Sequence, residues 1–363
     1  MTFTRIRLLA VGLVFFALPL GEVPVLTQGT AIYVATDGSD YNDGSESMPF
    51  RSFNRALEAL NPGGVLYIRG GSYGRLSVSD WLTRIPAGTS WYDAITITAA
   101  PGETVTLRGI SVEQKYAQYL IFDRLTIDAR YQLNEGVWIG AGAHHIRLSN
   151  LEIKNAAHFG IHVSPSSPGY NEILNANIHH NGTRSGLDHG IYISTRGNVV
   201  DGSTIHNNAA YGVHIYSGPC DDNVVRNSHI FDNGTLGGTT AGILLGSGAR
   251  NVAYNNVLLR NDIGIQADYY SPTYTEISRN TIVSSRYIGI YIGYGSSRAT
   301  VQDNVVHQTY PMIVNSGSQT VLSNNADSAP QLLGGVDGVI TNILGALQSR
   351  GLHSITEAPE PEQ

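Results

Sequence analysis

Histidines are concentrated in the middle of this 363-residue chain, where ten of the twelve lie within residues 144–229. A histidine titrates near neutrality, so it can take or give a proton, and a well-placed one accelerates a reaction by about 10²-fold to 10⁴-fold. The candidates for this role are His162, His189 and His214. Asp188 precedes His189, and its carboxylate could orient the imidazole or bind a cation. The alternative is that these are surface histidines without a role.

β-Elimination in a uronate polymer is a reaction that such side chains can perform. It needs a base for the C5 proton, an acid for the leaving oxygen, and a cation or basic group that neutralises the substrate carboxylate. His189 or His162 would be the base, and Tyr192 or Tyr216 the proton donor. Four basic residues near the middle of the chain could bind the carboxylate: Lys154, Arg184, Arg196 and Arg226. Each of the four could instead be a solvated surface charge.

Metal binding is a rival use of the same region. No His-x-His or His-Glu-x-x-His spacing indicates a zinc site among the candidate residues. Calcium fits a secreted acidic protein better, and Asp188 and Asp268 would supply oxygen ligands. No EF-hand-like loop fixes that assignment, and no other cofactor is expected.

A tandem repeat predicts the elements that position these residues. The motif Gly-apolar-x-apolar recurs at intervals of 22 to 30 residues, at Gly136, Gly160, Gly190, Gly212, Gly242, Gly264 and Gly289. Each coil carries a second apolar alternation, so it contains at least two short strands. Coils of this length with two or three strands are typical of a parallel β-helix. The Leu-x-Leu spine of leucine-rich repeats and the long amphipathic runs of helical repeats are both missing.

The repeat also predicts an outward column of side chains. Side chains alternate across a strand, so the residue between the two apolar positions of each motif faces solvent. These residues are Trp138, His162, Tyr192, His214, Leu244, Gln266 and Tyr291. We predict that Trp138, Tyr211, Gln266 and Tyr291 bind substrate. The three aromatic rings would stack on flat sugar rings. The alternative is that aromatic residues simply favour strands and stack on one another.

Two further features belong to the corners of the coils. Two coils are eight residues longer than their 22-residue neighbours, through insertions at 182–189 and 234–241, and loops at one corner should raise a wall along one face. Asparagines recur after the second apolar segment of each coil, where stacked turns let amides hydrogen-bond between coils. They are Asn181, Asn208, Asn233 and Asn261.

The N-terminal part adds a strand at Tyr33-Val34, a short amphipathic helix from Phe53 to Leu60, and another strand at Tyr67-Ile68. These segments resemble the opening of the pectate-lyase-like superfamily of secreted polysaccharide lyases and relatives, and the Gly-Ile-Tyr-Ile coils are similar to its repeat. The resemblance covers residues 31–325. It implies an all-β, single-stranded right-handed parallel β-helix with a short N-terminal capping helix and a C-terminal cap.

The resemblance favours a lyase that cleaves an acidic polysaccharide, and it leaves alternatives open. β-Helix alginate epimerases are similar in layout, but their Asp-Pro-His motif is absent here and Leu187-Asp188-His189 matches it poorly. β-Helix glycoside hydrolases carry paired aspartates on adjacent strands, whereas Asp188 and Asp268 lie several coils apart. A non-catalytic glycan-binding or cell-surface protein could use the same aromatic column.

Composition and termini complete the expectations. Arg5 and Arg7 precede an apolar run at 8–20, which is typical of a secretory signal and too short for a comfortable membrane span. We expect a signal peptide at 1–29, a β-helix domain at 30–327, and a C-terminal cap with a flexible acidic tail at 328–363. The mature protein is expected to be a secreted monomer without stable membrane insertion. The net charge of −7 argues against nucleic acid as a partner.

Overall fold

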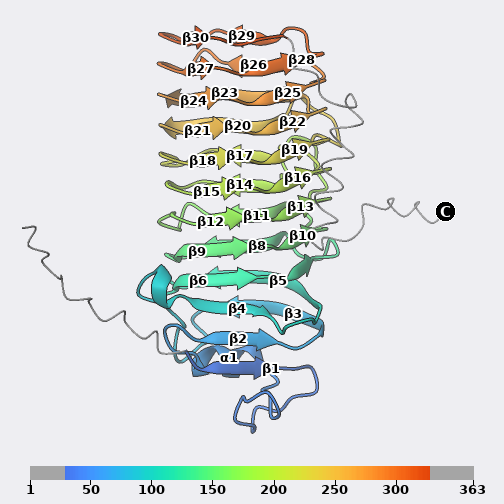
Figure 1. Ribbon diagram of the computed structural model, residues 1–363, viewed down its shortest axis with the longest axis vertical. Coiled ribbons are helices and arrows are strands. Elements are labelled where there is room, and N and C mark those ends of the chain that lie inside the picture. Colours follow the sequence, from blue (N-terminus) through green and yellow to red (C-terminus); the bar gives the residue numbers. More distant parts are fainter. Residues whose placement is uncertain (1–28, 328–363) are drawn as a thin grey trace, which may run out of the picture.

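The chain forms a tall solenoid in which short parallel strands stack turn upon turn (Figure 1). The computed structural model describes residues 29–327, and every strand of these residues belongs to one of three ladders. The predicted right-handed parallel β-helix is confirmed. The predicted C-terminal cap and tail, and all but the last residue of the predicted signal peptide, lie outside the described residues.

The first ladder is a twelve-stranded sheet that follows the whole stack from β1 to β30. Its strands are β1 (Ala31–Val34), β2 (Val65–Ile68), β4 (Ile95–Ala99), β6 (Gln118–Asp123), β9 (His144–Ser149), β12 (Glu172–Leu174), β15 (Val199–Asp201), β18 (Val224–Arg226), β21 (Val252–Tyr254), β24 (Glu276–Ser278), β27 (Thr300–Gln302) and β30 (Val321–Ser323).

The second and third ladders share one eighteen-stranded sheet, because β5 pairs with both β7 and β8. The second ladder consists of β7 (Thr126–Asp128), β10 (Glu152–Lys154), β13 (Asn177–His179), β16 (Thr204–His206), β19 (His229–Phe231), β22 (Val257–Leu259), β25 (Thr281–Val283) and β28 (Val305–His307). The third ladder consists of β3 (Gly71–Val78), β5 (Val105–Glu113), β8 (Glu135–Gly140), β11 (Phe159–Val163), β14 (Ile191–Ile193), β17 (Val213–Ile215), β20 (Ala241–Ala249), β23 (Ile263–Thr273), β26 (Ile288–Ile292) and β29 (Ile313–Asn315).

The interior is filled by the aliphatic residues that the alternation predicts. The fully buried positions of two successive coils are Ile173, Ile178, Ile191 and Ile193, then Val200, Ile205, Val213 and Ile215. These side chains belong to one continuous core cluster that runs through the stack. Burying each contributes about 1.5–3 kcal/mol, which stabilises strands only three residues long.

The predicted helix is α1 (Phe53–Ala59), which lies at the N-terminal end of the stack and contacts β1 and β3 (Figure 1). Ser52 caps it by accepting a hydrogen bond from the Arg55 backbone N–H at 3.2 Å. Ala56 and Leu57 are fully buried in the core cluster. A 3₁₀ turn, η1 (Trp91–Asp93), lies between β3 and β4. No helix of residues 29–327 is long and apolar enough to cross a membrane.

Asparagine ladders stabilise the corners between coils. In the predicted ladder each amide Nδ2 donates to the Oδ1 of the next coil, at 3.0 Å from Asn181 to Asn208, 2.9 Å from Asn208 to Asn233 and 3.1 Å from Asn233 to Asn261. This prediction is confirmed. Two more ladders of the same kind link Asn171, Asn198, Asn223 and Asn251, and then Asn256, Asn280, Asn304 and Asn325.

Candidate functional site

The strand register of the third ladder aligns the predicted outward column. His162 pairs with Trp138 on one side and Tyr192 on the other, and Tyr192 pairs with His214. The same register continues through Leu244 and Gln266 to Tyr291. The column therefore follows one face of the solenoid, as the Gly-apolar-x-apolar motif predicts.

A cleft of about 420 Å³ lies over the middle of this column. It is lined by Phe159, Arg184, Gly186, Leu187, His189, Tyr192, Tyr211, His214, Tyr216 and Tyr269. Six of these residues are among the predicted site residues, and they come from the two successive coils that contain β14 and β17. The cleft is thus the place where the structure brings the predicted acid–base residues together.

One wall of the cleft is the inserted loop 182–189. Asp188 is fully buried and organises this loop, because its carboxylate accepts hydrogen bonds from the Thr183 and Arg184 backbone N–H groups at 2.9 and 2.7 Å. The same carboxylate pairs with the Arg184 guanidinium at 2.7 Å. Ser185 Oγ donates to the Gly237 carbonyl at 2.7 Å, so the two inserted loops meet. The two insertions therefore lie on the same side of the solenoid, and loop 182–189 is the one that lines the cleft.

Tyrosines line another part of the cleft, and they are Tyr192, Tyr211, Tyr216 and Tyr269. Tyr216 follows β17, and its ring lies 5.7 Å from that of Tyr269 and 5.0 Å from that of Tyr270. Tyr269 and Tyr270 belong to the long end of β23, where the pairing with β20 shifts register after Leu245. Both β23 tyrosines are exposed, so their ring surfaces are available to a ligand.

His189 and His214 form the centre of the cleft, with ring centroids 4.1 Å apart. His214 stacks nearly parallel to Tyr192, Tyr211 and Tyr216, at centroid distances of 5.0, 4.5 and 4.9 Å. The Nδ1 atoms of both histidines are buried and have no hydrogen-bond partner within residues 29–327. Buried polar atoms are normally paired, so two unpaired imidazole nitrogens side by side are an unusual feature of this cleft.

Burial determines the protonation states of the histidines and tyrosines in the cleft. It lowers the pKa of His189 to about 3 and places that of His214 well below its usual range, because the imidazolium is poorly solvated there. Burial also raises the pKa of Tyr216 to about 12 and raises the pKa of Tyr211. At neutral pH the two histidines are neutral and the two tyrosines are protonated.

The remaining column residues flank the cleft without lining it. The His162 ring contacts Trp138 at 4.6 Å and stacks on Tyr192 at 5.2 Å, and neither of its nitrogens has a partner within the described residues. Desolvation lowers the pKa of His162 to about 4. Gln266 and Tyr291 continue the column on the other side, with Gln266 buried. These residues extend the face on both sides of the cleft.

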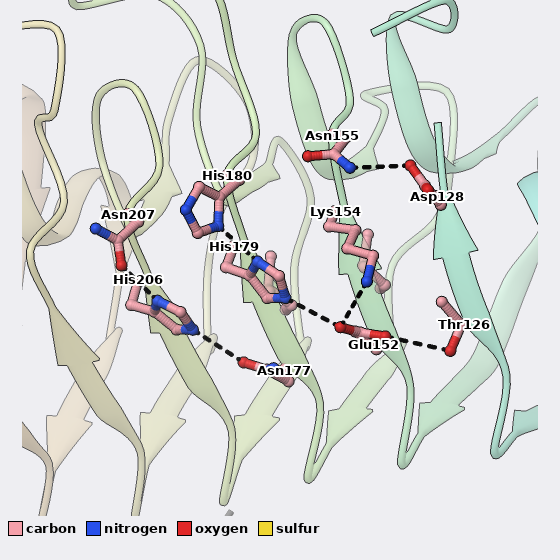
Figure 2. A network of polar contacts seen from close by, with 12 residues as sticks. Thr126, Asp128, Glu152, Lys154, Asn155, Asn177, His179, His180, His206 and Asn207 are labelled. Atoms are coloured by element: carbon pink, nitrogen blue, oxygen red, sulfur yellow. Dashed lines mark hydrogen bonds and ion pairs between the residues drawn. The ribbon is translucent and has the colours of Figure 1, made fainter. Parts of the chain in front are cut away.

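Three of the predicted basic residues lie on other faces. Lys154 projects from β10 in the second ladder, where its ammonium contacts Glu152 at 2.9 Å in a network with His179 (Figure 2). Arg226 lies on β18 in the first ladder and pairs with Asp201 at 2.8 Å. Arg196 lies in the turn after β14, 3.9 Å from Asp221. They are separated from the cleft because the chain bends each time it passes from one ladder to the next, so closeness in sequence does not put side chains on one face.

The structure does not bring the two predicted calcium ligands together. Asp188 belongs to the wall loop and is paired with Arg184, whereas Asp268 lies on β23, three coils from β14. Within residues 29–327, no group of three or more His, Cys, Asp or Glu side chains could hold a metal ion.

Phe159, Leu187 and Tyr269 line the cleft but were not among the predicted site residues. Phe159 has a sequence signal, because it occupies the position before the motif glycine, as do His189 and Tyr211. That position forms a second aromatic column beside the first, with Phe159 5.5 Å from His189 and His189 5.2 Å from Tyr211.

Comparison with known proteins agrees with this architecture. At the level of sequence, the chain is 24% identical over 330 residues to the uncharacterised protein YwoF of Bacillus subtilis (strain 168), covering 77% of this chain and 69% of that protein. Its fold is similar to an alginate lyase from Paenibacillus sp. str. FPU-7, with a TM-score of 0.57 and 19% identity over 76% of this chain and 96% of that chain. It is also similar to the pectate lyase Pel9A, with a TM-score of 0.51 and 16% identity over 83% and 78% of the chains. Residues 32–267 match the family described as Pel9A-like, right-handed β-helix region, and the chain belongs to this family.

Proposed function

We propose that the protein is an exported polysaccharide lyase that cleaves a uronate-containing chain by β-elimination in the cleft. The observation that carries this proposal is a cluster of neutral histidines and protonated tyrosines in one cleft that has no carboxylate among its lining residues. The activities of the similar pectate lyase and alginate lyase support a carbohydrate substrate. The basic and apolar pattern of the first twenty residues supports export.

The protonation states suit both halves of an elimination. His189 is neutral, so it can accept the C5 proton of the uronate, and Tyr192 or Tyr216 can donate a proton to the leaving oxygen. The electron pair of the C5–H bond forms the C4=C5 double bond while the C4–O bond breaks. Water is not consumed. After the reaction His189 carries one more proton and the tyrosine one fewer.

Arg184 is the cation that would bind the substrate carboxylate. It lines the cleft with its side chain about half exposed, and the pair with Asp188 fixes its position. A bound carboxylate also raises the pKa of His189, because a nearby negative charge favours the imidazolium. A histidine that stays neutral in the free protein therefore becomes a stronger base when substrate arrives.

The cleft does not suit glycoside hydrolysis. Hydrolases of this kind need two carboxyl groups roughly 5–9.5 Å apart on either side of the bond. Asp188 is buried under Arg184, and Asp262 is buried and paired with Arg286 at 2.9 Å. Neither is among the residues that line the cleft, so the described chain offers no such pair there.

The test is the ultraviolet absorbance of the unsaturated uronate while the purified protein acts on a panel of acidic polysaccharides, with and without calcium. We expect absorbance to rise for at least one substrate, and His189→Gln to reduce kcat/KM by about 10²-fold to 10⁴-fold. His307→Gln, on β28 away from the cleft, is the matched control and should keep full activity. A flat trace on every polymer, or equal rates for both variants, would refute the proposal.

A further inference from the structure

Two neighbouring outward columns of the third ladder carry almost no charge. From β5 to β26 its first column comprises Ser111, Trp138, His162, Tyr192, His214, Leu244, Gln266 and Tyr291. The positions two residues further on are Glu113, Gly140, Ser164, Ser194, Tyr216, Gly246, Asp268 and Gly293. Neither column contains a lysine or an arginine. The sixteen positions therefore offer aromatic, amide and hydroxyl groups over most of their length.

Carboxylates stand at both ends of this face. Glu113 is exposed on β5, and Asp268 lies on β23. The two are six strands apart along the ladder, which corresponds to roughly 29 Å at about 4.8 Å per strand. The strand β14, which contributes Tyr192 to the cleft, lies midway between them. A ligand that extends in both directions from the cleft meets a negative charge on each side.

Positive charge reaches the cleft at one point. Arg184 is the one cationic side chain among the residues that line the cleft, and Asp188 already offsets much of its charge. One uronate carboxylate can be neutralised there. Carboxylates on the neighbouring sugars would find no cation along the two columns, whereas neutral sugar rings can stack on Trp138, Tyr269 and Tyr291.

We infer that the substrate is a copolymer in which neutral sugars separate the uronates, rather than a chain of uronates alone. This inference rests on the proposed lyase function, because it places the reacting uronate at Arg184. The charge pattern admits one carboxylate at the centre and disfavours carboxylates toward Glu113 and Asp268. Alternation of acidic and neutral sugars matches that pattern.

The experiment measures both binding and elimination on matched pairs of oligosaccharides of equal length. One pair is alternating rhamnose and galacturonate against galacturonate alone, and the other is alternating N-acetylglucosamine and glucuronate against glucuronate alone. Affinity is measured by calorimetry and elimination by ultraviolet absorbance. We expect the copolymer of at least one pair to bind more tightly and to be cleaved with the higher kcat/KM.

Charge variants test the cause of the preference. The double variant Glu113→Gln, Asp268→Asn should raise kcat/KM on the uronate homopolymer by roughly fivefold at low salt, with a smaller gain at high salt because salt screens exposed charges. Asp43→Asn with Asp303→Asn changes the net charge equally at exposed sites on other parts of the solenoid. This control pair should leave the homopolymer rate unchanged.

The outcomes separate the two claims. If uronate homopolymers bind as tightly as the copolymers and are cleaved as fast, the inference is overturned while the lyase function stands. If the copolymers bind preferentially and no polymer undergoes elimination, the lyase function fails and the binding preference remains supported. An equal gain from the control pair would show that net charge, and not the two ends of the face, sets the preference.

Discussion

At the scale of single residues, the cleft depends on imidazoles that burial keeps neutral. His189 is 3% exposed and His214 is 8% exposed, and both are surrounded by aromatic rings. At His189 desolvation outweighs the opposing effect of the Asp188 charge on the pKa. An ordinary histidine near pKa 6.5 would be half protonated just below neutrality and would then fail as a base. Aromatic packing thus extends the pH range over which the proposed base is unprotonated.

The pH dependence of the reaction follows from that state. Because the pKa of His189 is lowered to about 3, kcat/KM should stay level from neutrality down to about pH 5, where a histidine of ordinary pKa would lose more than tenfold. Steady-state kinetics in constant-ionic-strength buffers measures this. As pH is lowered, kcat should begin to fall at a higher pH than kcat/KM does, since the bound carboxylate raises the pKa of the imidazole.

A different base would give a different profile. If a tyrosine removed the C5 proton, its phenolate would be required, and kcat/KM would climb tenfold for each pH unit toward the raised pKa of Tyr216. A loss centred near pH 6.5 would instead indicate a solvated histidine. Either result would contradict His189 as a buried neutral base.

Most candidate residues of the column could be predicted from the sequence, because the motif glycine fixes which side chain of each coil faces outward. His162, Tyr192 and His214 line up for that reason. The position of Tyr269 could not be predicted in this way. Tyr269 has φ 81° and Ser271 has φ 48°, and these left-handed residues shift the register of β23 beyond what alternation describes.

At the scale of elements, the bends between strands determine where the side chains of the cleft are held. Strands of three residues supply few backbone hydrogen bonds, so the amide ladders hold the bends at a constant geometry. The wall loop 182–189 leaves the stack one residue after Asn181, whose amide is bonded to Asn208 in the next coil. The corner ladder therefore anchors the base of the loop that carries Arg184.

Breaking the ladder should cost stability. In Asn208→Ala the buried backbone N–H and Nδ2 of Asn181 lose their acceptor, and Asn233 loses a donor, so we expect unfolding free energy to fall by about 2 kcal/mol or more. Urea unfolding followed by circular dichroism measures it. Asn54→Ala, at an exposed position of α1, is the control and should change stability by less than about 0.5 kcal/mol. Equal effects would mean that the amides do not support the corner.

The ladder assignment of the basic residues could not be derived from position in the chain. Lys154, Arg196 and Arg226 lie in the middle coils, yet they fall on the second ladder, a turn and the first ladder. The turns between ladders differ in length, so the face of each residue depends on where the chain bends. By contrast, the strand period and the glycine spacing were sufficient to predict the fold.

At the scale of the whole molecule, buried histidines link stability to acidity. His206 on the second ladder lies beside His179 (Figure 2). It is 1% exposed and stacks between His179 and Phe231, and burial lowers its pKa to about 3. His162 and His189 behave in the same way. Below pH 6.5 the unfolded chain binds protons that the folded chain excludes, so the folded state loses stability as pH falls.

Acidification should therefore destabilise the protein before its carboxylates titrate. Between pH 7 and 5.5 we expect Tm to fall, with each such histidine lowering the unfolding free energy by at most about 1.4 kcal/mol per pH unit below its unfolded pKa. His206→Phe, which keeps a flat ring against Phe231, should make this fall shallower. Thermal unfolding at several pH values measures the slope. An identical slope in the variant would mean that His206 is not excluded from protonation.

The measurement that tests the central claim most directly is the mass of the products released from an acidic polysaccharide. Elimination breaks the chain without adding water, so the account predicts a new non-reducing end one water lighter than a hydrolysis product, formed by the wild type and lost in His189→Gln. Products that carry the added water, or that form equally well in His189→Gln, would contradict it.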